Sequence, residues 1–550
     1  MLTIFPSDGR PSYAKYFVEV LRSEGFRGLE TCALDEINAA RFETMTTVIV
    51  PHLLDCGDTC RQLCLDYVEA GGTLVIFHPT EATARALGIA ATGQIVPQAT
   101  MQVPSGDGQL LEMALHTPVA RWRTDNAELV LQCTYRDTLL PAALRITRGR
   151  GVILAFAFDV AEVIALTRHG DPDLRGIHTA SSDGVFRNLD LFAYQLETVQ
   201  SKYPVLDLFT AFLANLVAAT AQLPRLWYYP EAMQRSTLVL SADDYRSQPH
   251  AYRIFVEELA DADVHCTFSI QRGCEIAPEA IQAWLAAGHT FGALATYPED
   301  SATHLAHTPT PQAFTTMLSS SLAWYTKTFK TPTRTMRLYG ERWYGYIDAA
   351  KALEAQHVEM DLTTVPRHPY GAWVSGSTRP IRYVDEHGGV QKIFHQPTSW
   401  SDRLLVDATV AGGYRWSTLL ATMVTDEIIE RAVETSYSPI VVATSPQTYV
   451  TASRALIQAN IQAARRHGMP ILSTEEWLQW NQTREKTMLT MTDAELTVRA
   501  AVDVPAVTVI IPAGYVPTLP AQRVVRWGRS QVMVTLALQA GFPVVVATAS

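Results

Sequence analysis

The stretch LVLSADD at residues 238–244 is an apolar run that ends on two adjacent carboxylates. The run has the composition of a buried strand, so Asp243 and Asp244 stand where that strand would end. Helical and strand patterns alternate after it up to about residue 480, and repeated βα units over this length predict a barrel. Barrel enzymes carry their active sites at the carboxyl ends of the strands. The doublet is therefore the first candidate for a functional site.

Short apolar runs and helical stripes recur at regular spacing in this part of the chain. The predicted strands are residues 237–240, 264–270, a brief strand around Phe291, 335–339, 358–362, 439–444 and 470–472. The predicted helices are residues 252–259, a helix opened by Pro278, 312–327, 347–355, 417–435, 450–466 and one starting at Ser473 with Glu476 in capping-box spacing. Residues 366–410 interrupt the rhythm, and Asp385-Glu386-His387-Gly388-Gly389 indicates a hairpin turn there. We expect an insertion over one barrel face or a β-hairpin.

Shifts in pattern divide the chain into four regions. The predicted regions are an α/β domain at 1–165, a linker with a buried helix at 166–235, the barrel at 236–480 and a small β-rich domain at 487–550. In the first region, apolar runs at 46–50 and 73–77 flank a helix that Gly71-Gly72 ends, which predicts a parallel sheet. Short β-rich runs separated by turns predict a sandwich-like C-terminal domain. The fold class is therefore α/β with a small all-β addition.

The composition is that of a folded protein without a nucleic-acid surface. Hydrophobic residues make up 47% and charged residues 18% of the 550 residues, and the formal net charge is −11. An acidic chain without clustered Lys and Arg disfavours nucleic acid and anionic membranes as partners. The most apolar helical stretch, residues 206–223, is interrupted by polar residues and predicts a buried helix, not a membrane span. No secretory signal is visible, so we expect a cytoplasmic protein.

Two clusters of ligand-binding residue types are interpreted as packing. Cys56, Cys60 and Cys64 share a helical face, but no fourth soft ligand accompanies them, and seven cysteines in total favour reduced thiols over disulfides. The aromatic run Trp227-Tyr228-Tyr229 could stack on a sugar or pack between domains. Interdomain packing is the favoured interpretation, because each ring buries a large area.

Three segments resemble the catalytic domain of polysaccharide deacetylases in order and spacing. They are STLVLSADDY, ADADVHCTFSI and IQAWLAAGHTFG, and the resemblance covers roughly residues 236–480. In that family the first aspartate of the pair acts as general base and the second binds a divalent metal, usually zinc, with two histidines. The resemblance implies these roles for Asp243 and Asp244. Such a metal lowers the pKa of bound water and polarises an acetyl carbonyl, while the base takes the proton.

The remainder of the family's site is only partly matched. Where the family has its metal histidines, directly after Gly288-His289, this chain continues as TFGALATYP, and His289 itself is interpreted as structural. His304 and His307 have metal-like spacing but stand about ten residues late, as a polar-loop pair often does by chance. Arg337 matches the family's arginine motif and would either orient the general base or pair within the barrel. Ser445-Pro446 replaces the family's late histidine.

A second resemblance concerns roughly the first 165 residues. The stretches VIVPHLLD and YVEAGGTLVIF resemble the glutamine-amidotransferase-like, flavodoxin-like domain that accompanies some glycosidases. Active members of that class carry a cysteine on a tight strand-to-helix turn, whereas here Phe77 is followed by His78-Pro79-Thr80-Glu81. The resemblance therefore implies a sheet domain used for packing or recognition.

The leading expectation is a deacetylase-like barrel with a degenerate metal site that binds or positions a glycan, or serves as a scaffold. The alternative is an active metal-dependent deacetylase that hydrolyses N- or O-acetyl groups of a glycan, with zinc or another divalent metal held by His304, His307 or His395. A purely structural assembly protein is the third class. The Asp pair has a structural interpretation as well, since aspartates at a βα junction can cap the next helix. The sequence leaves the oligomeric state open.

Overall fold

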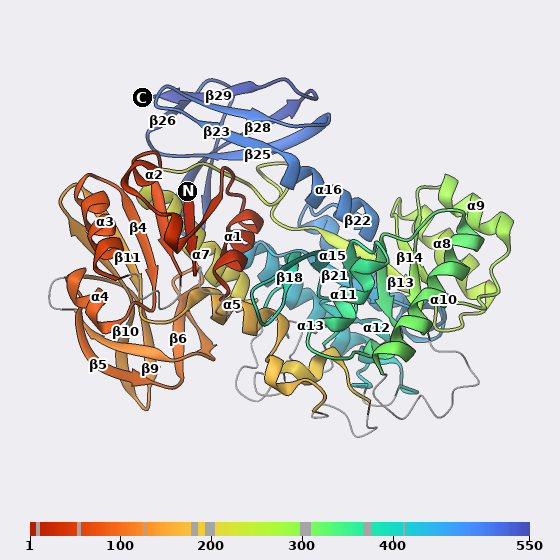
Figure 1. The fold of residues 1–550 in the computed structure, drawn as a ribbon. Coiled ribbons are helices and arrows are strands. Elements are labelled where there is room, and N and C mark those ends of the chain that lie inside the picture. The colour runs from red at the N-terminus through yellow and green to blue at the C-terminus, as the bar shows by residue number, and fades with distance from the viewer. Residues whose placement is uncertain are drawn as a thin grey trace.

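The computed structural model describes residues 1–6, 12–51, 57–124, 127–177, 185–192, 204–296, 310–366, 376–410 and 413–550. An N-terminal sheet with its helices lies on the left of Figure 1, the central sheet and its helices lie on the right, and two small C-terminal sheets lie above them. Each of these parts has its own cluster of buried apolar side chains.

The N-terminal sheet has nine strands in the order β2-β1-β3-β4-β11-β10-β9-β6-β7. Its parallel half contains β1 (Leu2–Phe5), β2 (Glu30–Ala33), β3 (Thr47–Val50), β4 (Thr73–Phe77) and β11 (Gly151–Phe156). Its antiparallel half contains β6 (Ala99–Pro104), β7 (Leu110–Leu115), β9 (Glu128–Tyr135) and β10 (Thr138–Arg148), while β5 (Ala90–Val96) and β8 (Val119–Arg123) form a separate pair. The parallel half confirms the predicted α/β pattern. The antiparallel half was not predicted from the sequence.

Helices pack on this sheet. They are α1 (Ala14–Ser23), α2 (Ala39–Glu43), α3 (Gly57–Glu69), α4 (Glu81–Ala86), α5 (Val160–His169) and α7 (Val205–Ala221). Cys60 and Cys64 on α3 are buried in the apolar cluster of this part, as their packing interpretation requires, whereas Cys56 lies outside the described residues. The predicted linker is not a loose connection, because α7 packs into the N-terminal core while Leu174, Phe186 and Phe192 pack into the central one.

The central sheet has the order β18-β19-β17-β16-β15-β14-β13-β21-β20, with β22 beside β13. The strands are β13 (Leu238–Asp243), β14 (Thr267–Ile270), β15 (Thr290–Ala295), β16 (Thr335–Leu338), β17 (Met360–Asp361), β18 (Ile381–Val384), β19 (Val390–His395), β20 (Trp400–Ser401), β21 (Ile440–Thr444) and β22 (Ile471–Ser473). The helices are α8 (Pro249–Asp261), α9 (Pro278–Ala286), α10 (Pro311–Phe329), α11 (Asp348–Ala355), α12 (Asp402–Val406), α13 (Thr418–Arg431), α14 (Pro446–Thr448), α15 (Arg454–Arg466) and α16 (Thr474–Lys486). Parallel pairing dominates, as the βα alternation predicts.

This sheet agrees with the predicted α/β class, although its described strands do not close into a complete barrel. Within the described residues β18 and β20 are the two edges of the strand order and do not pair with each other, so the sheet is an open half-barrel. The predicted hairpin is confirmed, since β18 and β19 are antiparallel and Gly388 N–H bonds Asp385 O across the turn. The capping box is confirmed as well: Ser473 Oγ accepts from Glu476 N and Glu476 Oε2 accepts from Ser473 N.

The C-terminal part consists of two four-stranded sheets. One has the order β12 (Arg225–Leu226), β25 (Val504–Ile511), β28 (Arg529–Leu538) and β27 (Gln522–Arg526), and the other β23 (Met488–Met491), β24 (Glu495–Arg499), β29 (Val544–Ala549) and β26 (Tyr515–Pro517). Apolar side chains from both sheets form one core, which agrees with the predicted sandwich. The strand β12 comes from the segment ahead of the central sheet, so this segment ties the C-terminal part to the rest.

The three parts meet at a junction of buried aromatic and charged side chains. Trp227 and Tyr229 are fully buried and pack near Tyr437 and Trp477, as the interdomain-packing interpretation expects. At the end of α1, Glu24 is 2% exposed and accepts hydrogen bonds from Thr210 Oγ1 at 2.7 Å, from Arg379 Nη1 at 2.9 Å and from the Tyr228 hydroxyl. Arg225 Nη1 lies 3.8 Å from the same carboxylate. The parts of the chain are therefore joined by a fully partnered buried acid, which we call the Glu24 junction.

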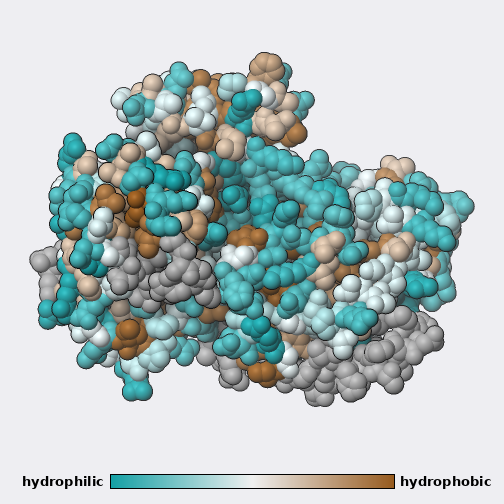
Figure 2. Space-filling model, in the orientation of Figure 1, coloured by the Kyte–Doolittle hydropathy of each residue, from teal (hydrophilic) through white to brown (hydrophobic). Residues whose placement is uncertain are grey.

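None of the described helices is long and apolar enough to span a bilayer, and α7 is the buried helix that the sequence predicts. The face drawn in Figure 2 is mainly hydrophilic, with small separate apolar areas. Small scattered apolar areas are usual for a protein surface.

Candidate functional site

The doublet lies at the carboxyl end of a central parallel strand, as predicted. In β13, Leu238–Leu240 pair with β22, and Ser241–Asp243 pair with β14. On the other side, Ala242 is in register with Thr444 of β21. Because β22 accompanies only the first half of β13, the strand ends between β14 and β21, and the side chains that follow these two strands surround the doublet.

Asp243 forms a buried ion pair with Arg337. The two side chains are 1% and 2% exposed, and Arg337 Nε lies 3.4 Å from Asp243 Oδ1. Arg337 Nη2 also donates to Ser241 Oγ at 3.2 Å, and the Tyr245 hydroxyl donates to Asp243 Oδ2 at 3.4 Å. Burial raises the pKa of Asp243, and the Arg337 guanidinium partly offsets this. The structure thus brings together Asp243 and Arg337, the two catalytic residues that the sequence proposes. Their contact is compatible with both interpretations of Arg337, which are orientation of the general base and ion pairing within the barrel.

Asp244 closes the turn that leads into α8. It is fully buried, and its Oδ1 accepts a hydrogen bond from Ser247 N at 3.0 Å. Burial raises the pKa of Asp244, while the Ser247 N–H and the nearby Tyr252 hydroxyl hold it down in part. The capping interpretation needs one correction: the carboxylate holds the turn before α8, and the N-cap position itself is Gln248, whose side chain makes no cap hydrogen bond. A local backbone contact therefore occupies one oxygen of the implied metal ligand.

A third carboxylate, Asp402, stands at the same edge of the sheet and was missed from the sequence. It follows β20, which pairs with β21, and its Oδ2 accepts from Thr444 Oγ1 at 2.6 Å and from Ser453 Oγ at 2.5 Å. Asp402 is fully buried, and burial raises its pKa to about 6. The strand before it has only two residues, so no strand pattern marked the position. Only the pairing of β20 with β21 shows that Asp402 belongs to this edge.

Asp361 and His395 form a neighbouring buried cluster around Tyr383. Asp361 is in register with Met336 of β16, and its Oδ2 accepts from the Tyr383 hydroxyl at 2.7 Å. The Tyr383 ring stacks on His395 at 4.6 Å, and His395 Nε2 is 2.8 Å from Thr364 Oγ1. Burial holds the pKa of His395 well below its usual value, so the ring is neutral. His395 is thus held by a ring stack and a hydroxyl.

The described residues do not make a zinc site of the usual kind. Among them, no group of three or more His, Cys, Asp and Glu side chains is placed to hold a metal ion, and catalytic zinc takes three protein ligands. His304 and His307 lie outside the described residues. His289 is buried and its Nδ1 accepts from Cys266 N at 3.3 Å, and burial lowers its pKa to about 4, which fits its structural interpretation. Among the described residues, Asp244 therefore has no neighbouring side chains that would complete a three-ligand zinc site.

Several buried polar atoms at this edge lack a hydrogen bond of normal geometry. They are Asp243 Oδ1, Asp244 Oδ2, Asp402 Oδ1, Gln271 Nε2 and Arg337 Nη1. Buried polar atoms are nearly always partnered in folded proteins, and clusters of exceptions are found where a water, an ion or a ligand binds. The edge therefore keeps the polar character of a binding site.

An aromatic pair stands beside these charges. The rings of Tyr245, after β13, and Tyr339, after β16, lie 5.4 Å apart at an angle of 54°, and both residues are partly exposed. The Arg403 guanidinium lies over the Tyr245 ring at 4.0 Å. Two partly exposed rings next to a guanidinium combine an apolar surface with hydrogen-bond donors, which suits a neutral polyhydroxylated ligand.

The turn after β4 has an unusual backbone at His78. His78 has a φ of 41°, a left-handed conformation that is uncommon for residues other than glycine, and it is 6% exposed. Its N–H donates to Phe156 O at 2.8 Å, which fixes the turn to β11. The turn is strained, and it carries an imidazole at its end.

No family model matches the chain, and no curated protein matches it. Among solved structures, a putative polysaccharide deacetylase from Mycobacterium smegmatis matches 48% of this chain and 96% of its own at 13% identity, with a TM-score of 0.35. A mutant of a CE4 family pseudoenzyme with restored enzymatic activity matches 46% of this chain and 69% of its own at 12% identity and a TM-score of 0.29. A β-galactosidase from Bacillus circulans sp. alkalophilus matches 27% of this chain and 25% of its own at 14% identity and a TM-score of 0.22. Part of the chain is thus similar to polysaccharide deacetylases of known structure at low identity, and these TM-scores assign no activity.

Proposed function

We propose that the central half-barrel is a deacetylase-like domain that binds a glycan without hydrolysing it. The observation that carries this proposal is the burial of both carboxylates of the doublet, at 1% for Asp243 and 0% for Asp244. A general base must reach the attacking water, within hydrogen-bond distance or through one further water. Here the base candidate faces Arg337, and the ligand candidate holds the turn before α8.

The proposed ligand surface is the aromatic pair beside the doublet. Ligands of open α/β sheets bind outside the carboxyl ends of the strands, and Tyr245, Tyr339 and Arg403 occupy that edge. Sugar rings present an apolar face and a rim of hydroxyls, which match the tyrosine rings and the guanidinium. The resemblance of the segments around the doublet to polysaccharide deacetylases makes an acetylated glycan the first ligand to try.

The test combines binding and turnover on the full chain. We expect a chitooligosaccharide to bind in calorimetry without release of acetate, and Tyr339→Ala to weaken binding by about tenfold, as loss of a stacked ring does. Tyr135→Ala is the matched control, because Tyr135 is a partly exposed tyrosine on β9 of the N-terminal sheet. Equal binding by wild type and Tyr339→Ala would contradict the proposed surface. A chain that binds no glycan at all would favour the scaffold interpretation.

A second candidate is an active metal-dependent deacetylase, and one observation favours it. Asp243 Oδ1 and Asp244 Oδ2 are buried without hydrogen bonds of normal geometry, which is typical of oxygens that bind an ion or a water. Metal analysis separates the two candidates directly. About one zinc per chain, with acetate release that Asp243→Asn abolishes, would establish the second candidate and end the first.

A further inference from the structure

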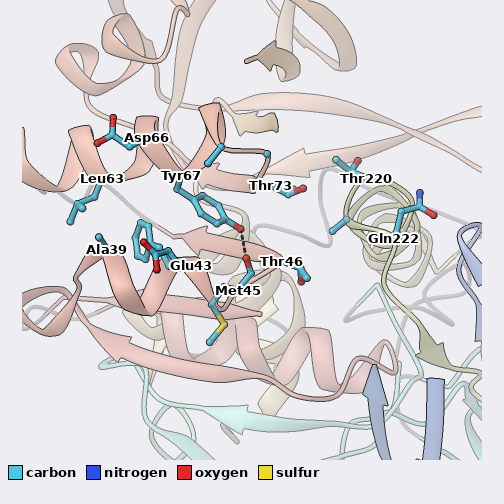
Figure 3. Close-up of a pocket in the computed structure, with 15 residues that line it drawn as sticks. Ala39, Glu43, Met45, Thr46, Leu63, Asp66, Tyr67, Thr73, Thr220 and Gln222 are labelled. Carbon is cyan, nitrogen blue, oxygen red and sulfur yellow. Dashed lines mark hydrogen bonds between the residues drawn. The ribbon is translucent and has the colours of Figure 1, made fainter. Parts of the chain in front are cut away.

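A cavity lies at the amino-terminal edge of the N-terminal sheet, where β3 and β4 begin. It has a volume of about 730 Å³, within the range of small-molecule sites. Its walls come from α2, the end of α3, the turn into β4 and the end of α7, as Figure 3 shows. The cavity therefore lies where the connecting helix α7 meets the N-terminal sheet.

The lining of this cavity is acidic. All of its lining residues are described, and the ionisable ones among them are Glu43, Asp66 and Tyr67, with no Lys, Arg or His. Helix carboxyl ends carry partial negative charge, and neither α3 nor α7 has a basic residue in its last turn. Arg150 Nη2 donates to Ala70 O and so compensates the end of α3 in part. At the end of α7, Gln222 Nε2 donates to Ala219 O at 2.7 Å, so this helix end is compensated in part as well. The two carboxylates remain as the charged groups of the lining.

One wall of the cavity is a rigid apolar surface. The Tyr67 hydroxyl donates to Met45 O at 3.1 Å, and the Phe42 ring meets the Tyr67 ring edge-on at 5.5 Å. Gly72 lets the Tyr67 ring lie directly on the backbone, since a Cβ there would stand 2.2 Å from Tyr67 Cζ. Burial raises the pKa of Tyr67, so it stays a neutral donor. Leu63 extends this apolar lining.

We propose that this cavity binds a small organic cation with an aliphatic body, of the alkyl diamine class. Charge complementarity selects the cation: a carboxylate ligand would meet Glu43, Asp66 and the end of α7 with no cation among the lining residues. Shape and polarity select the aliphatic body, which lies against the Phe42, Tyr67 and Leu63 side chains while the ammonium groups remain near the partly hydrated carboxylates. This site is independent of the proposed glycan surface.

The test titrates the full chain with 1,5-diaminopentane by calorimetry at low ionic strength. We expect Glu43→Gln and Asp66→Asn each to weaken binding by about fivefold, the size of an exposed ion pair, and the double variant to weaken it further. Both side chains are exposed, so the variants should fold normally. The matched control is Asp58→Asn, because Asp58 is an exposed aspartate on α3 that does not line the cavity.

Neutral and anionic analogues make the result decisive. 1,5-Pentanediol has the same chain without charge, and glutarate carries the opposite charge, so neither should bind measurably. Raising the salt concentration should weaken diamine binding, because exposed charges are screened. Equal binding of the diol, unchanged binding in the double variant or no binding of the diamine would each overturn the proposal.

Discussion

The Glu24 junction and the edge around Asp243 are both groups of buried charges, and they differ in how completely their acids, Glu24 and Asp243, are partnered. Glu24 receives hydrogen bonds from Thr210, Tyr228 and Arg379, which come from separate segments of the chain. Asp243 has a 3.4 Å ion pair and a 3.4 Å hydrogen bond, and its Oδ1 makes no hydrogen bond of normal geometry.

The difference separates assembly from binding. A buried acid with a full set of partners costs little in the folded state and fixes the segments that supply those partners. Buried polar atoms left without partners carry a desolvation cost that a folded protein keeps where a ligand, ion or water compensates it. The junction therefore joins the parts of the molecule, and the edge of the central sheet is the place where a ligand gains most from binding.

Removing the acid of the junction should have the largest effect on stability. We expect Glu24→Gln to lower the free energy of unfolding by about 3–5 kcal/mol, because Arg379 and Arg225 would remain buried without their counter-charge. Urea unfolding measures this. The control is Glu128→Gln, which breaks an exposed pair with Arg145 and should cost under about 1 kcal/mol. Equal costs for the two variants would remove the distinction between a buried junction and an ordinary surface pair.

The pH dependence of the free energy of unfolding tests whether Asp402 carries an unfavourable buried charge at the edge of the central sheet. Its folded-state pKa of about 6 lies above that of an unfolded aspartate, so the native state binds the proton first and stability is lost as the pH rises through 6. We expect wild type to gain about 2.5 kcal/mol relative to Asp402→Asn when the pH is lowered from 8 to 4. Urea unfolding of both proteins across this range measures the difference. A difference that does not change with pH would mean that Asp402 carries no unfavourable buried charge.

The coupling between Asp243 and Arg337 is the smallest of the three expected effects. We expect the double variant Asp243→Asn, Arg337→Met to be more stable than the sum of the single variants by about 1–2 kcal/mol, since each single variant leaves a buried charge unpaired. The matched cycle uses Asp244→Asn, whose carboxylate is held by Ser247 N. Additive single effects at Asp243 would show that the 3.4 Å contact carries no energy.

Much of the central fold could be predicted because its signals are local. Buried parallel strands are short apolar runs, so β13, β16 and β21 were visible, and the doublet was placed correctly at the end of β13. The hairpin at Asp385–Gly389 and the capping box at Ser473 are also local patterns. Such features need only neighbouring residues to form.

Other features could not be predicted, because they depend on contacts between distant segments. The antiparallel half of the N-terminal sheet has strands such as β6, in which buried and partly exposed residues alternate without a long apolar run. The open edges of the central sheet follow from which strands pair, and β20 has only two residues. Asp402 could therefore be assigned to the candidate site only from the tertiary structure.

The sequence by itself determined most strands and helices of the central part, that βα units repeat there, and that two carboxylates end one central strand. Only the tertiary structure decided that Arg337 faces Asp243, that Asp402 joins the same edge, and that Glu24 gathers partners from three distant segments. The physical reason is the range of the interactions. Periodicity, turns and caps are set by residues close in the chain, whereas burial and charge pairing depend on which distant segments the folded core brings together.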